Sequence, residues 1–196
     1  MRDFRRNLVY GEAMLNRNPD SSRSAALSTV RPPRSLLALA LVMPAISAAT
    51  ILGALGFQHI GGYEPCALCL MQRTPYYVGI PIAAVAVVAA WLGAPRWILV
   101  VLFAAFGLLL LYNAGLAAYH SGVEWGFWEG PSACAQAPAG GSASDMLGQL
   151  GTVTPASCTE AVWRLLGLSF AGWNVLISGL LAALGLYAVR AAWLRA

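Results

Sequence analysis

Four cysteines, at positions 66, 69, 134 and 158, are the residues of this chain best suited to chemistry. Cys66 and Cys69 form a C-x-x-C pair, and the thiols of such a pair can close a small disulfide ring. The thiolate is the reactive form of cysteine, and its pKa falls near a helix N-terminus or a cation. Pro65 suits the first turn of a helix, so we expect both cysteines in that turn. The spacing therefore predicts a site of thiol–disulfide exchange.

Arg73 is the candidate cation of this site. It lies four residues after Cys69 and seven after Cys66, so all three would share one face of a helix. An arginine at membrane depth is costly and marks a functional site. We expect Arg73 to stabilise a thiolate or another developing negative charge.

Cys134 and Cys158 form a second, widely spaced pair in a stretch, 132–157, that is rich in glycine and serine. Such a loop has little side chain to bury, so a disulfide that closes it would be exposed. Exposed disulfides tend to be oxidising and labile, which suits a pair that accepts electrons from another protein. A purely structural role as a loop staple remains open for this pair.

The four cysteines could also form a structural disulfide or bind a metal or a haem. The C-x-x-C pair could form an inert structural disulfide. It also supplies half of the usual spacing of a zinc site with four cysteine ligands, although Cys134 and Cys158 do not supply the other half as a second C-x-x-C. A c-type haem needs histidine directly after the second cysteine, and residue 70 is leucine. We expect no metal at this site.

The composition indicates a membrane protein. Hydrophobic residues make up 59% of the chain and charged residues 10%, whereas a soluble domain carries about 25% charged residues. Every basic residue is an arginine, and seven of the 12 lie in the first 34 residues, before the first apolar segment. We interpret this placement as a signal of membrane topology and expect no nucleic-acid partner.

Four apolar segments are long enough to span a bilayer, which takes about 17–25 residues. They are residues 36–57, 76–92 with a start as early as Pro65, 97–119 and 172–189. The first segment is longer than the apolar part of a signal peptide, so we expect an uncleaved helix, with a possible kink at Pro44. The predicted fold is an all-α membrane protein, a bundle of four transmembrane helices with a long loop between the third and the fourth.

The arginines also predict the orientation. The N-terminal arm, the turn at Arg96 and the C-terminal tail hold ten of them, and the other two connections hold only Arg73 and Arg164. The positive-inside rule puts both termini in the cytoplasm and the cysteines on the outer side.

The predicted domains follow from this orientation. Residues 1–34 are a poorly ordered cytoplasmic arm, 35–190 are the membrane domain with outer loops 58–75 and 120–171, and 191–196 are a cytoplasmic tail. Trp125, Phe127, Trp128 and Trp163 favour the headgroup region. Residues 160–170 are predicted either as a short interfacial helix or as an extension of the fourth span.

Four spans, a C-x-x-C pair at the outer end of the second and a spaced pair in the long outer loop resemble the DsbB family of disulfide bond formation proteins. The resemblance covers about residues 36–190 and rests on Pro65-Cys66-Ala67-Leu68-Cys69, Gln72-Arg73, Tyr119-His120, Cys134 and Cys158. The vitamin K epoxide reductase family also combines four helices with C-x-x-C and a quinone. Its C-x-x-C follows the loop pair, however, so the order of the cysteines differs.

The resemblance implies a role for each of these residues. The Cys134–Cys158 disulfide would oxidise a periplasmic thioredoxin-fold protein similar to DsbA, with Cys134 as the point of attack. A transient link between Cys66 and Cys158 would then carry the electrons inward. The family's cofactor is a membrane quinone, ubiquinone or menaquinone, so Cys69 would face the quinone and Arg73 would help to polarise it.

The resemblance also maps His120 near the quinone. Gln72 stands where some members of the family have an acidic residue, and the loop of this chain is richer in glycine and serine.

The function predicted from the sequence is that of a quinone-dependent protein thiol oxidase in the bacterial inner membrane, with redox-active loops facing the periplasm. A disulfide-stapled membrane scaffold without turnover is the alternative. A carrier that moves reducing equivalents outward would need a cytoplasmic thiol, and no cysteine lies on that side.

Overall fold

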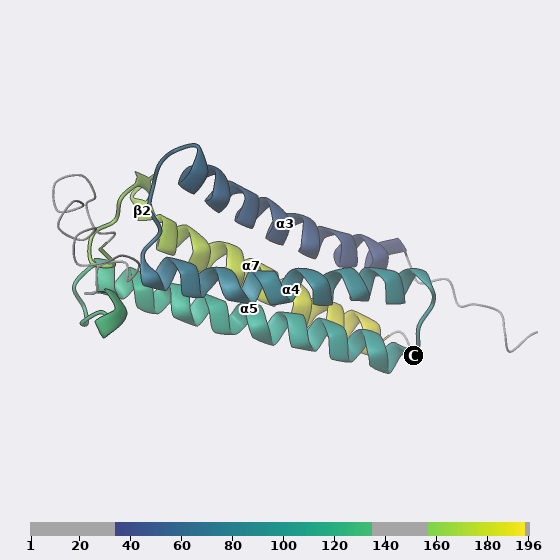
Figure 1. The fold of residues 1–196 in the computed structure, drawn as a ribbon. Helices are drawn as coiled ribbons and strands as arrows, with labels where there is room; N and C mark the ends of the chain where they lie inside the picture. Colours follow the sequence, from purple (N-terminus) through teal and green to yellow (C-terminus); the bar gives the residue numbers. More distant parts are fainter. Residues whose placement is uncertain (1–33, 135–156, 195–196) are drawn as a thin grey trace, which may run out of the picture. The chain divides into compact units, whose positions relative to one another are not determined.

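The structure is a computed structural model, and it describes residues 34–134 and 157–194. Within these ranges lie four long helices, α3 (Arg34–His59), α4 (Ala67–Trp91), α5 (Arg96–Glu124) and α7 (Phe170–Leu194). The predicted four-helix membrane fold is confirmed (Figure 1). The predictions for the N-terminal arm, for Arg195 and for loop residues 135–156 lie outside the described residues.

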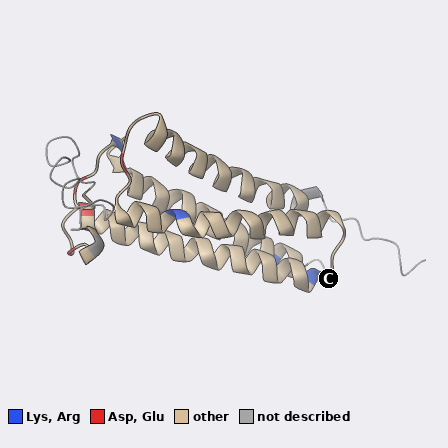
Figure 2. Cartoon of the chain, viewed as in Figure 1, with Lys and Arg blue, Asp and Glu red and all other residues tan. Residues whose placement is uncertain are grey.

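All four helices are long and apolar enough to cross a membrane, with mean hydropathies from 1.5 to 2.3. Large apolar side chains such as Leu52, Val85, Leu108 and Leu176 remain exposed on the outside of the bundle. A helix that is apolar on every side suits lipid rather than water. Figure 2 shows the charged residues gathered mainly toward the ends of the helices, with long uncharged stretches between them.

Each helix packs against two others: α3 against α4 and α7, and α5 against α4 and α7. The core between them contains Phe103, Phe106 and Leu110 of α5 and Leu181 of α7. Helices α5 and α7 approach most closely at a glycine pair, because a Cβ added at Gly185 would lie 2.8 Å from the Cα of Gly107. Small residues allow this kind of close backbone approach between membrane helices.

The helices start and end somewhat differently from the predicted spans. Helix α4 begins at Ala67 with Cys66 as its N-cap, so Pro65 precedes the helix instead of lying in its first turn. Helix α5 continues to Glu124, five residues past the predicted end at 119. Helix α3 runs through Pro44 as one continuous element. With these boundaries, Arg73 lies within α4 and His120 lies within α5.

The predictions for residues 160–170, an interfacial helix or an extension of the fourth span, are wrong. This segment forms a small antiparallel hairpin of β1 (Arg164–Leu165) and β2 (Leu168–Ser169). Leu166 and Gly167 connect the two strands with φ angles of 52° and 83°. Two consecutive residues with positive φ are the signature of a two-residue hairpin turn, and they cannot continue a right-handed helix.

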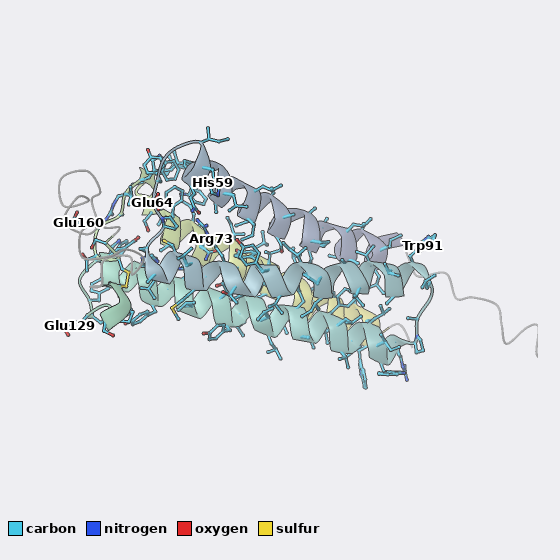
Figure 3. All side chains as sticks on the ribbon, viewed as in Figure 1. His59, Glu64, Arg73, Trp91, Glu129 and Glu160 are labelled. Carbon is cyan, nitrogen blue, oxygen red and sulfur yellow. A yellow bond between two sulfur atoms is a disulfide. The ribbon has the colours of Figure 1, made fainter. Side chains whose placement is uncertain are left out.

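One end of the bundle carries the residues of interest. The start of α4, the end of α5, the hairpin and the short 3-10 helix η1 (Ser132–Cys134) meet there. In Figure 3, His59, Glu64, Arg73, Glu129 and Glu160 lie toward this end, and Trp91 lies at the other.

Candidate redox site

Cys66 and Cys69 lie at the N-terminus of α4 with their sulfur atoms 3.0 Å apart, sharing a hydrogen bond. Both are free thiols; Cys66 is buried and Cys69 is half-buried. The extended backbone of Cys66 makes it the N-cap of the helix, and its Sγ accepts a hydrogen bond from the backbone N–H of Cys69 at 3.3 Å. A sulfur in this position faces the positive end of the helix dipole.

These surroundings make Cys66 the more acidic thiol of the pair. The hydrogen bond with Cys69 lowers the pKa of Cys66 to about 4, although burial opposes the change. The contact of His120 Nε2 with the Cys66 sulfur, at 3.6 Å, acts in the same direction. The lowered pKa favours the thiolate of Cys66, the form that attacks disulfides and binds electrophiles.

Cys134 and Cys158 are joined by a disulfide, with their Cα atoms 5.5 Å apart. Cys158 is only 1% exposed, so this half of the disulfide is less accessible than its loop composition suggests. Because these two sulfurs are bonded to each other, they are not available to complete a zinc site with Cys66 and Cys69.

The two cysteine pairs meet in one apolar cluster. Its buried members are Cys66, Leu68, Val123 and Cys158, and Cys69 and Cys134 pack against them. The N-cap cysteine of α4 and the buried half of the loop disulfide therefore belong to the same cluster. The sequence alone could not show this cluster, because it depends on where Cys134 and Cys158 pack against the ends of α4 and α5.

A cavity of about 270 Å³ opens beside the C-x-x-C pair. Its walls come from α3, α4 and α7, with His120 and Glu124 of α5 at one side. Of the residues predicted from the sequence, Cys66, Cys69, Arg73 and His120 line this cavity. Cys134 and Cys158 do not line it and belong to the cluster that also contains Cys66.

Arg73 lies half-buried on the wall of this cavity. One nitrogen, Nη1, donates a hydrogen bond of 2.5 Å to Oε1 of Gln58 in α3. A guanidinium has five N–H donors, so others remain for an acceptor in the cavity. Arg73 and Cys69 both belong to α4 and both line this cavity.

Aromatic side chains close the cavity toward the hairpin. Phe57 of α3 lies with its ring centroid 4.8 Å from that of Phe170 and 5.4 Å from that of Trp163. Tyr63 extends the group at 6.0 Å from Phe57. The apolar residues after 160 therefore build a wall of the cavity, a role that sequence reasoning missed.

His120 connects Cys66 to a chain of buried polar side chains. Its Nε2 lies 3.6 Å from the Sγ of Cys66, and its Nδ1 lies 2.8 Å from Nε2 of Gln72. Oε1 of Gln72 accepts a hydrogen bond of 2.6 Å from Nδ2 of Asn174 in α7. Oδ1 of Asn174 accepts from the Tyr76 hydroxyl at 2.7 Å.

The chain ends deeper in the bundle. Ser178 hydrogen-bonds to both Tyr76 and Asn174, and Asn113 of α5 donates to its Oγ at 2.9 Å. The only signal of this network in the sequence is the presence of single polar residues within apolar spans. Buried polar groups must find partners, so such residues can be expected to meet.

Comparison with known proteins agrees with this architecture. The family model "Disulfide bond formation protein DsbB" matches residues 34–188. Disulfide bond formation protein B of Marinobacter nauticus is 33% identical over 141 residues, which is 66% of this chain and 77% of that protein. Disulfide bond formation protein B of Polaromonas is 30% identical over 162 residues, 76% of this chain and 86% of that protein. No solved structure was found to match. The chain belongs to the DsbB family of disulfide bond formation membrane proteins.

Proposed function

We propose that this protein is a quinone-dependent thiol oxidase that reoxidises a DsbA-like dithiol protein in the periplasm. The observation that carries the proposal is the burial of Cys66 and Cys158 in one cluster, with Cys69 opening onto the adjacent cavity. Two redox pairs that pack in one cluster can exchange disulfides without a large movement of the chain. A structural staple would not need a second pair beside it.

Electrons would enter at Cys134. A thiolate of the partner attacks its Sγ, the partner–Cys134 bond forms, and the electron pair of the Cys134–Cys158 bond leaves on Cys158. The second partner thiol then releases Cys134 and carries away the new disulfide. The greater burial of Cys158 supports Cys134 as the attacked sulfur, because an incoming protein must reach it.

The second exchange passes the electrons to the C-x-x-C pair. The Cys158 thiolate attacks Cys66 of an oxidised Cys66–Cys69 pair, and the electron pair of that bond leaves on Cys69. When the Cys134 thiolate then attacks Cys158, the loop disulfide re-forms and the electron pair of the Cys66–Cys158 bond leaves on Cys66. The dithiol beside an intact loop disulfide, as in this structure, is the state that must next lose two electrons.

The side chains that line the cavity are of the kinds that would bind a quinone headgroup. Such a ring is apolar and carries two carbonyl acceptors. The cavity offers apolar and aromatic walls, including Ile177 and Phe57, and donors from Arg73 and Asn174. A quinone bound there would supply the acceptor for two electrons and two protons. Arg73 would orient it, and Cys69 would face it.

The distribution of charge supports an orientation in the bacterial inner membrane. Arg96 at the start of α5 and Arg190 near the end of α7 lie at the end of the bundle opposite the cysteines. By the positive-inside rule that end would face the cytoplasm, and both cysteine pairs would face the periplasm.

Steady-state oxidation of a reduced DsbA-like protein tests the proposal. The purified chain should oxidise it with a ubiquinone or a menaquinone analogue, whereas Cys66→Ser and Cys134→Ser should fall to background. Trp91→Phe, at the opposite end of the bundle, serves as the control and should keep full turnover. If the wild type is inert with both quinones, the proposal fails and the scaffold alternative gains support. If either serine variant keeps turnover, the relay through both cysteine pairs is wrong.

A further inference from the structure

His120 has a different partner on each ring nitrogen. Nδ1 lies 2.8 Å from Nε2 of Gln72, and Nε2 lies 3.6 Å from Sγ of Cys66 and 3.9 Å from Oε1 of Glu124. An amide nitrogen can only donate a hydrogen bond, so Nδ1 must be an acceptor. In a neutral imidazole the proton then belongs on Nε2, which faces the thiol and the carboxylate.

The end of the Gln72 amide that faces His120 decides the tautomer, and a second contact of Gln72 fixes its orientation. Nε2 of Gln72 also lies 3.3 Å from the backbone carbonyl oxygen of Leu68. A carbonyl accepts only, so turning the amide over would bring two oxygens together. Asn174 is consistent with this, because its Nδ2 donates to Oε1 of Gln72.

The other hydroxyls of the network do not decide the direction. Tyr76 and Ser178 can each donate or accept, so they could follow either orientation of Asn174. The backbone carbonyl oxygen of Leu68 can only accept a hydrogen bond, so it fixes the orientation of the Gln72 amide. The backbone of α4 therefore sets the direction of the whole row of hydrogen bonds.

The same three residues could otherwise be taken for a metal site. The ligand atoms of Cys66, Cys69 and His120 lie within 4.8 Å of one another. Glu124 is close by, and its Oε2 is buried without a hydrogen-bond partner among the described residues. A histidine that binds a metal must present a bare nitrogen, and it almost always donates the N–H of its other nitrogen to an acceptor. Gln72 offers Nδ1 a donor instead.

We propose that Gln72 is a positioning residue that holds the proton of His120 on Nε2, which makes His120 a hydrogen-bond donor to Cys66 and disfavours metal binding at the dithiol. The N–H donates to the Cys66 sulfur and stays on the ring, so no proton is transferred. The bond favours the thiolate of Cys66 over its thiol. A reduced dithiol protected from metal capture stays available for exchange.

The charged and titratable groups around this site come from several elements. Glu124 faces Nε2 from α5, Cys66 and Cys69 from α4, and Glu64, Arg73 and Glu160 line the adjacent cavity. Of these groups, Cys66 lies 3.6 Å and Glu124 lies 3.9 Å from the Nε2 atom of His120. Both are acceptors in their charged forms, which agrees with a proton on that nitrogen.

Nitrogen NMR of the histidine rings in the reduced protein tests the tautomer directly. The chain has two histidines, and His59→Gln removes the other, exposed one and assigns the signals. The expected result is a protonated Nε2 and an unprotonated Nδ1 for His120. Gln72→Glu should move the proton to Nδ1, since a carboxylate can only accept. A wild-type ring with its proton on Nδ1 would overturn the proposal.

Metal binding gives a second and independent readout. Titration with Zn²⁺, using alkylation of the thiols to report occupancy, should show reduced Gln72→Glu binding about tenfold tighter or more than the wild type. Gln72→Met, which has no hydrogen-bond donor, should lie between them. Tight Zn²⁺ binding by the wild type that is lost in His120→Ala would contradict the proposal. The inference builds on the site of the proposed oxidase, but neither readout needs turnover, so failure of the oxidase assay leaves both results interpretable.

Discussion

Cys158, the buried half of the loop disulfide, and Cys66, the first cysteine of the C-x-x-C pair, belong to the same apolar cluster. They are 92 positions apart in the sequence, and Cys158 packs in a cluster with the start of α4 and with Val123 near the end of α5. The cluster brings the two pairs of cysteines together, as the proposed path for electrons requires. The cavity that Cys66 and Cys69 line would be the end point of that path.

Arg73→Ala should weaken quinone-dependent turnover while both disulfides can still form. The substitution removes the guanidinium from the cavity wall along with its bond to Gln58. A hydrogen bond to a charged group contributes about 1.5–3 kcal/mol, so the quinone KM should rise about tenfold or more. Arg164→Ala, in the hairpin, is the matched control and should leave the KM unchanged. An unaltered KM in Arg73→Ala would argue against this role.

The reactivity of Cys66 should depend little on pH in the neutral range. Because the pKa of Cys66 is lowered to about 4, its thiolate predominates above that value and is lost as the pH falls through it. Alkylation of Cys66, followed by mass spectrometry with the loop disulfide intact, should therefore stay nearly constant between about pH 6 and 8. An ordinary thiol would react about tenfold faster for each pH unit in this range, and that result would refute the lowered pKa.

Gly122→Ala should disturb the connection that leads from α5 to the loop disulfide. A Cβ at this position would overlap the ring of Trp128, whose Nε1 donates to the backbone oxygen of Tyr119 at 2.8 Å. Displacing Trp128 should expose the Cys134–Cys158 disulfide and speed its reduction by a small thiol. Gly115→Ala on the same helix meets no atom within 4 Å and should reduce at the wild-type rate. Equal rates for both variants would contradict the expectation.

Gly185→Ala should destabilise the bundle without changing the redox chemistry. The added Cβ would lie 2.8 Å from the Cα of Gly107, so α5 and α7 would have to move apart. Overpacking of this kind costs about 1–3 kcal/mol, and thermal unfolding in detergent should show it. Gly179→Ala, also in α7, has open space at its Cβ and should be at least as stable as the wild type. The thiol reactivity of Cys66 should be the same in both variants.

Most of the fold could be predicted from the sequence because each span is a long apolar segment between charged or turn-forming residues. The ends were less predictable: α5 continues past residue 119 through His120 to Glu124, because helical bonding persists beyond the apolar stretch. The hairpin was missed because its turn depends on Leu166, a residue that rarely adopts positive φ. A leucine at position 166 does not predict a positive φ angle.

The candidate site was predictable in part. The cysteines and Arg73 are recognisable from residue type and spacing, and the resemblance to a family supplied the pairing and His120. The contacts of Gln72 with His120 and Asn174 were not predictable, because they depend on how α4, α5 and α7 are rotated relative to one another. Single polar residues in apolar spans show that partners must exist but do not say which ones.

Disulfide formation between the two pairs tests the central claim most directly. A variant with Cys69→Ser and Cys134→Ser retains Cys66 and Cys158, and its matched control with Cys66→Ser and Cys158→Ser retains Cys69 and Cys134. After mild oxidation in membranes, peptide mapping without reductant should find a Cys66–Cys158 disulfide in the first variant and far less cross-linking in the second. If Cys66 and Cys158 stay reduced, or if Cys69 and Cys134 cross-link as readily, the two pairs do not form the proposed relay.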